Sequence, residues 1–70
     1  MADVKSQISG TVWQVLVEVG QEVTEDEDLI ILESMKMEIP VSAPQDGKVA
    51  EILVTPSQPV QEGQVLLRLE

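Results

Sequence analysis

The sequence predicts an all-β protein, a flattened β-barrel or sandwich of two four-stranded antiparallel sheets with an internal pseudo-twofold repeat. Three observations lead to this fold class. Segments rich in β-branched residues alternate with turn residues. No stretch of a dozen residues keeps a helical period of 3.6 free of Gly, Pro or strand-like clusters. The chain also matches itself without gaps at a fixed offset.

Gly10 and Gly47 mark the offset of this repeat, which is 37 residues. Each copy ends in the pattern Leu-x-x-Leu-Glu. One unit spans residues 1–33 and the other spans residues 38–70, so that Ser34–Met37 belongs to neither. We call two residues that lie 37 positions apart repeat mates. The identical or similar mates are Val4 with Val41, Val12 with Val49, Val15 with Ile52, Leu16 with Leu53, Val17 with Val54, Gln21 with Gln58, Val23 with Val60, Glu25 with Glu62, Leu29 with Leu66, Leu32 with Leu69 and Glu33 with Glu70.

The expected strands fall at matching places in the two units. They are Thr11–Val19 with Lys48–Thr55, and Leu29–Leu32 with Val65–Leu69. Turn residues such as Ser-Gly, Asp-Gly and Pro-Ser-Gln-Pro separate them. Two four-strand units joined by a short link then predict a pair of sheets related by a pseudo-twofold axis.

Two irregularities are expected inside the units. The residues from Val12 to Val17 do not alternate cleanly between apolar and polar, which predicts a bulge or burial on both faces. Trp13, whose repeat mate is Ala50, is expected to be partly exposed.

The loops predict two further features. Asp26 is the repeat mate of Gly63, which fits a position with φ > 0 that aspartate tolerates. Gly20 is the repeat mate of Ser57, beside Pro56, so the shape of the second loop stays open.

Composition limits the function classes. A chain of 70 residues, 43% of them hydrophobic, forms one small domain, residues 1–70, with an aliphatic core because Trp13 is its only aromatic residue. The chain has no cysteine, which excludes disulfides, Fe–S clusters and a catalytic thiol, and no histidine for acid–base chemistry near neutral pH. No catalytic constellation or phosphate-binding loop is present, so we expect no enzyme and no catalytic residues.

Charge and hydropathy limit the partners and the compartment. A net charge of −9 argues against nucleic acid, whose phosphates would be repelled. No apolar run approaches the roughly 20 residues of a membrane span, and no basic, apolar leader is present. We therefore expect no membrane association and a cytoplasmic or organelle-matrix location. The acidic run 25–28 is expected to be a solvated loop, because it lacks the spaced oxygen ligands and central glycine of a calcium loop.

The link Ser34–Met37 is the repeat mate of the gap between the chain ends. It should therefore lie at the end of the molecule opposite the termini, as an exposed hairpin tip. A two-residue hairpin would place Met35 and Lys36 at the centre of the turn, where φ > 0 favours Asn-Gly or Gly. Met and Lys would cost about 1 kcal/mol or more per residue there. A turn that breaks its own residue rule indicates a segment kept for chemistry.

Glu33-Ser34-Met35-Lys36-Met37 resembles the attachment motif Glu-Ala-Met-Lys-Met of the biotinyl/lipoyl attachment domain family, with serine for alanine. The similarity covers essentially the whole chain, and includes strands after the motif within residues 47–60. The resemblance implies a barrel-sandwich hybrid fold. It also implies that biotin is attached covalently to Lys36, with Glu33, Ser34, Met35 and Met37 as flanks that a ligase recognises. Lipoyl-type members more often carry Asp-Lys-Ala at this place, so the methionines favour biotin over lipoate.

The resemblance further implies a biotin carrier that shuttles carboxyl groups between the active sites of a biotin-dependent carboxylase. Its partners would be a biotin protein ligase and the biotin carboxylase and carboxyltransferase components, and we expect a monomer in isolation. Because nearly all lysine amines are protonated at neutral pH, the ligase must both activate biotin and deprotonate or desolvate the amine.

Other interpretations stay open at this stage. The protein could be a lipoyl carrier for acyl transfer, or an unmodified interaction module of the same fold. Lys36 could be a plain surface lysine, as we expect Lys5 and Lys48 to be. Met35 and Met37 could be core filler, which is what most methionines are.

Overall fold

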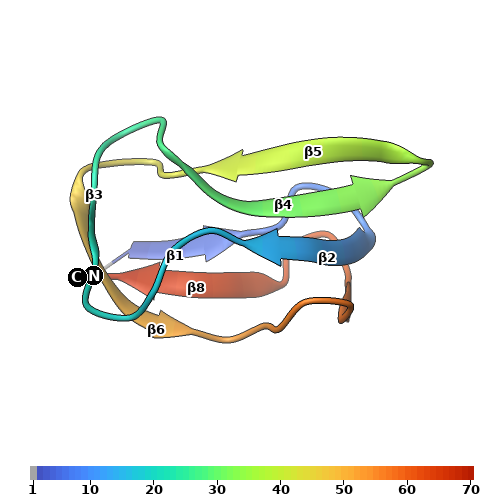
Figure 1. The fold of residues 1–70 in the computed structure, drawn as a ribbon. Coiled ribbons are helices and arrows are strands. Elements are labelled where there is room, and N and C mark those ends of the chain that lie inside the picture. Colours follow the sequence, from blue (N-terminus) through green and yellow to red (C-terminus); the bar gives the residue numbers. More distant parts are fainter. Residues whose placement is uncertain (1) are drawn as a thin grey trace.

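The computed structural model describes residues 2–70 and consists of eight β-strands in an elongated body of 30 × 18 × 18 Å (Figure 1). Residues 2–70 hold no helix that could cross a membrane. The strands are β1 (Ala2–Lys5), β2 (Gly10–Val15), β3 (Glu22–Val23), β4 (Asp28–Ser34), β5 (Met37–Ser42), β6 (Gly47–Ile52), β7 (Pro59–Val60) and β8 (Val65–Leu69).

The strands form two antiparallel sheets, in the orders β1-β8-β6-β3 and β5-β4-β2-β7. We call them the β8 sheet and the β4 sheet. In each sheet the two central strands come from one repeat unit and the two outer strands come from the other. The predicted sandwich of two four-stranded sheets is therefore confirmed, and its two units are interleaved.

The sheets do not close into a barrel, so that part of the prediction is wrong. No strand pair within residues 2–70 joins one sheet to the other. β1, β3, β5 and β7 remain edge strands, and β3 and β7 are only two residues long. The short edges β3 and β7 offer few backbone groups for pairing, and a cleft separates the longer edges β1 and β5.

The core between the sheets is aliphatic and follows the repeat. Buried repeat mates include Val12 with Val49 and Leu32 with Leu69, all at most 1% exposed. Burying each such side chain contributes roughly 1.5–3 kcal/mol. Because mates from both units fill one core, neither unit has a core of its own.

The irregularity predicted in the first long strand is a bulge. The register of β2 against β4 shifts between Val12 and Gln14, so Trp13 is the extra residue. β6 bulges at the equivalent place, Ala50. Trp13 is 44% exposed, which confirms the prediction.

The long strands end earlier than predicted. β2 ends at Val15 and β6 at Ile52, although residues 16–19 and 53–55 keep strand-like composition. The reason is topological, since β2 and β3 lie in different sheets and the chain must cross between them after residue 16. The four edge strands were not predicted, because β1, β3 and β7 are short and β5 contains Pro40, which an edge strand tolerates.

The loops keep the repeat even where their residues differ. Gly20 and Ser57 both have positive φ, 92° and 73°, so the second loop retains the shape of the first. Asp26 and Gly63 also both have positive φ, 71° and 86°, which confirms the prediction for Asp26.

Candidate functional site: the lysine hairpin

The hairpin is held by the longest strand pairing in the molecule. β4 and β5 pair from Asp28↔Ser42 to Ser34↔Met37, which leaves Met35 and Lys36 as the two turn residues. Their φ values are 53° and 63°. Positive φ at both central positions is what a type I′ hairpin turn requires, so the predicted turn is confirmed.

The side chains of the turn point into solvent. Met35 is 91% exposed and Met37 is 64% exposed, so the interpretation of these methionines as core filler is wrong. Lys36 and Glu33 are exposed and Ser34 is half-buried. Two thioethers thus flank the lysine on the outside of the protein, where they are available to a partner.

The hairpin forms one end of the molecule, and the chain ends lie at the other (Figure 1). The termini lie close together because Ala2 pairs with Leu69. This arrangement agrees with the location expected from the repeat. A partner can therefore reach Lys36 without approaching the chain ends.

Gly10 supports the base of the hairpin. From the sequence, this residue was predicted only to mark the repeat. A Cβ at position 10 would lie 2.6 Å from the carbonyl oxygen of Glu33, so β2 passes close to β4 beside the turn. Gly47 has the same relation to Glu70, at 2.9 Å. The alignment of both glycines in the repeat was the signal that could have indicated this close approach.

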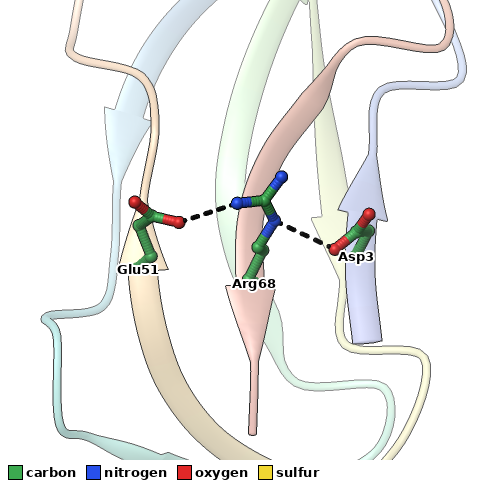
Figure 2. A network of polar contacts seen from close by, with 3 residues as sticks. All are labelled: Asp3, Glu51 and Arg68. Carbon is green, nitrogen blue, oxygen red and sulfur yellow. Dashed lines mark hydrogen bonds and ion pairs between the residues drawn. The ribbon is translucent and has the colours of Figure 1, made fainter. Parts of the chain in front are cut away.

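The lysine amine takes part in none of the ion pairs among residues 2–70. Both of those ion pairs involve Arg68, whose Nε lies 3.1 Å from Asp3 and whose guanidinium also lies 3.0 Å from Glu51 (Figure 2). All three side chains are exposed, so each pair contributes at most about 1 kcal/mol. Lys36 is thus a primary amine presented to solvent on an ordered turn.

Two other features of residues 2–70 do not serve this amine. A cleft of about 680 Å³ lies between the edge strands β1 and β5, and its lining residues do not include residues 34–37. No group of three or more acidic side chains in the described part of the chain is placed to hold a metal ion, the acidic run 25–28 included. The chemistry that the hairpin itself offers is acylation of an exposed amine.

Residues 1–69 match the biotin/lipoyl family model described as "Biotin-requiring enzyme". The chain belongs to this family. It is 42% identical over 66 residues to the "Biotin/lipoyl attachment protein" of Bacillus subtilis, which covers 94% of this chain and 90% of that protein. It is 39% identical over 67 residues to the "Pyruvate carboxylase" of Bacillus subtilis, covering 96% of this chain but 6% of the carboxylase.

Among solved structures, the chain resembles the lipoyl domain of the 2-oxoglutarate dehydrogenase complex from Azotobacter vinelandii. The TM-score is 0.82 at 29% identity, and the match covers 100% of this chain and 96% of that domain. A lipoyl domain and a segment of a carboxylase therefore share this family's sequence or fold. The fold alone does not separate the two cofactors.

Proposed function

We propose that this protein is a biotin carrier, in which a biotin protein ligase attaches biotin to Lys36 and a carboxylase uses the attached group. The observation that carries the proposal is the hairpin: an exposed lysine between two exposed methionines, at positive φ, at the end far from the termini. The family match and the similarity to pyruvate carboxylase support it.

The chain contributes the amine, and the ligase contributes the catalysis. Acylation forms an amide bond between Lys36 Nζ and the biotin carboxyl carbon, while the group that activated this carboxyl leaves and the amine loses a proton. The chain has no histidine or cysteine that could assist this step. Activation and deprotonation therefore fall to the ligase active site.

Once Lys36 is acylated, the protein positions a tethered group. Biotin supplies a ring that carries a carboxyl group from one active site to another. The arm reaches roughly 12–15 Å from the backbone if its bonds are nearly extended. Pairing of β4 with β5 up to Ser34↔Met37 fixes the base of this arm, so its mobility begins at the lysine side chain. Tethering then raises the local concentration at a docked active site towards the millimolar range.

Biotin is proposed over lipoate because of the Met-Lys-Met sequence at the turn. The proposal includes Glu33, Ser34, Met35 and Met37 as the flanks that the ligase reads. It also includes biotin carboxylase and carboxyltransferase components as partners, a monomeric state, and a location in the cytoplasm or an organelle matrix.

Intact mass measurement tests the proposal. The protein is incubated with MgATP and either biotin and a biotin ligase, or lipoate and a lipoate ligase. We expect one biotinyl group per chain with the first enzyme, none in Lys36→Arg, and full modification in the control Lys48→Arg. A lipoyl adduct without a biotinyl adduct, or a biotinyl adduct that persists in Lys36→Arg, would contradict the proposal.

A further inference from the structure

The two outer faces of the sandwich carry different charges at equivalent positions. On the β8 sheet, Asp3, Arg68 and Glu51 stand side by side on β1, β8 and β6 and form both ion pairs of Figure 2. Their repeat mates stand side by side on the β4 sheet, on β5, β4 and β2. These mates are Pro40, Ile31 and Gln14, none of them charged.

A second row of cross-strand neighbours shows the same difference. On the β8 sheet Glu22 of β3 pairs with Lys48 of β6. The repeat mates on the β4 sheet are Pro59 of β7 and Thr11 of β2, which also pair. Each of these five charged positions is uncharged on the sheet that carries the lysine hairpin, although Thr11 also pairs with the exposed Glu33 of β4, which in turn pairs with the exposed Glu38 of β5.

Trp13 adds a large aromatic side chain to this uncharged surface. It is exposed next to the exposed Gln14, while Val12 and Val15 face the core. Its repeat mate on the β8 sheet is only Ala50. We define the neutral face as the outer surface made by Thr11, Trp13, Gln14, Ile31, Pro40 and Pro59. Few charges and an exposed aromatic residue are typical of the central part of a protein–protein interface.

The neutral face reaches the hairpin through the exposed pair Glu33 and Glu38, which lies between the turn and the pair Ile31 and Pro40. Ile31 lies three residues before Ser34, and Pro40 lies three residues after Met37. Each is therefore roughly 10 Å along its strand from the turn. A lysine side chain places Nζ roughly 6 Å from its Cα. An enzyme that takes Nζ into its active site must therefore contact the protein surface around the turn. An enzyme that acts on the biotin ring can stay roughly 12–15 Å from the turn, which is the length of the extended arm.

We propose that the neutral face is the docking surface for the biotin ligase that acylates Lys36. This inference rests on the proposed function. It assigns the recognition of the domain to one side of the sandwich, in addition to the residues that flank the lysine.

The test measures ligation and docking separately, with a biotin ligase, biotin and MgATP. Trp13→Arg and Ile31→Arg place a charge on the neutral face. Ala50→Arg and Leu53→Arg are matched controls, because Ala50 is the repeat mate of Trp13 and Leu53 is a 39% exposed residue after β6 of the other sheet. Each substitution is also made in Lys36→Arg, and that protein is used as a competitor of wild-type ligation. Unfolding in urea checks that each variant is folded. Trp13→Ala replaces a neutral-face variant that does not fold.

We expect kcat/KM for ligation to fall roughly tenfold in the neutral-face variants through a higher KM, and to stay within about twofold in the controls. The Lys36→Arg forms of the neutral-face variants should inhibit wild-type ligation less strongly, by the same factor. Equal behaviour of the two sets overturns the proposal, as does unchanged ligation with reduced use of the biotinylated protein by a carboxylase. If wild-type protein accepts no biotin at all, the proposed function fails, which is a separate outcome.

Discussion

Met35 and Lys36 occupy a backbone conformation that asparagine and glycine adopt at lower cost. Their φ values of 53° and 63° lie in the left-handed region, where an ordinary L-residue costs roughly 1–2 kcal/mol. Lys36 is needed for its amine, so its cost cannot be removed without loss of the proposed site. Met35 is not needed for the amide bond to biotin. A substitution at Met35 can therefore change the stability of the turn and its recognition by the ligase independently.

Met35→Asn should therefore stabilise the unmodified protein by about 0.5–1 kcal/mol, because asparagine tolerates φ > 0 better than methionine. Urea unfolding followed by Trp13 fluorescence measures this change. The control is Met37→Asn, which lies in β5, where asparagine is disfavoured, and which should not stabilise. If the ligase reads Met35, the same variant should be biotinylated more slowly although it is more stable. A loss of stability in Met35→Asn would contradict the assigned cost of the turn.

At the scale of elements, the two glycines that begin β2 and β6 allow a direct comparison. Gly10→Ala would place a Cβ 2.6 Å from the carbonyl oxygen of Glu33, which is paired with Thr11 of β2 on one side and with Glu38 of β5 on the other. Gly47→Ala would place one 2.9 Å from the carbonyl oxygen of Glu70, which lies just after the end of β8.

We expect Gly10→Ala to destabilise the protein by roughly 1–3 kcal/mol and Gly47→Ala by clearly less. Thermal unfolding followed by circular dichroism measures both. Because Glu33 belongs to the hairpin strand, Gly10→Ala should also slow ligation. Equal destabilisation by the two variants would show that the chain end is as constrained as the hairpin base.

The crossover loops provide a pair of substitutions with opposite expected signs. Ser57 has a φ of 73°, and its repeat mate Gly20 has a φ of 92°. Ser57→Gly should raise stability by about 0.5–1 kcal/mol, after the greater entropy of glycine in the unfolded chain is deducted. Gly20→Ser should lower it by about 1 kcal/mol. Chemical denaturation of the two variants beside wild type measures both shifts, and a common sign would contradict the equivalence of the loops.

These elements also show what the sequence could and could not predict. The repeat predicted that the lysine link lies opposite the termini. The uneven alternation of residues 12–17 predicted a bulge or burial on both faces, and the structure has the bulge, at Trp13. The pairing of strands across the two units could not be read in this way. β1 has no partner within its own unit and pairs with β8, so its existence depends on contacts about 65 residues away in the chain. The difference between the two outer faces likewise became visible only when the cross-strand neighbours were known.

At the scale of the whole molecule, the pseudo-twofold axis relates the lysine link to the gap between the termini. The pair Ala2↔Leu69 is the repeat equivalent of Ile39↔Leu32, which flanks the hairpin. Four residues added between Glu70 and the N-terminus would therefore occupy the equivalent of Ser34–Met37. If the added residues are Ser-Met-Lys-Met, the molecule gains a second lysine turn at its opposite end, on the β8 sheet.

A circular permutant with this linker, opened between the exposed residues Pro44 and Gln45, separates the roles of the turn and of the neutral face. The permutant should keep its β-sheet circular dichroism and unfold cooperatively, because the new link joins ends that already lie side by side.

Its two lysine turns share the same four residues, and a glutamate precedes each of them. They differ in the residue that follows the link, which is Glu38 after the native turn and Met1 after the added one. They also differ in the sheet below: beyond Glu33 and Glu38 it carries the neutral face near Lys36, and beyond Glu70 it carries Asp3, Glu51 and Arg68 near the added lysine. We expect a biotin ligase to modify Lys36 at the wild-type rate and the added lysine at least roughly tenfold more slowly, as measured by peptide mass mapping over time. Equal rates at the two turns would mean that the four-residue link suffices, and that the ligase does not use the neutral face.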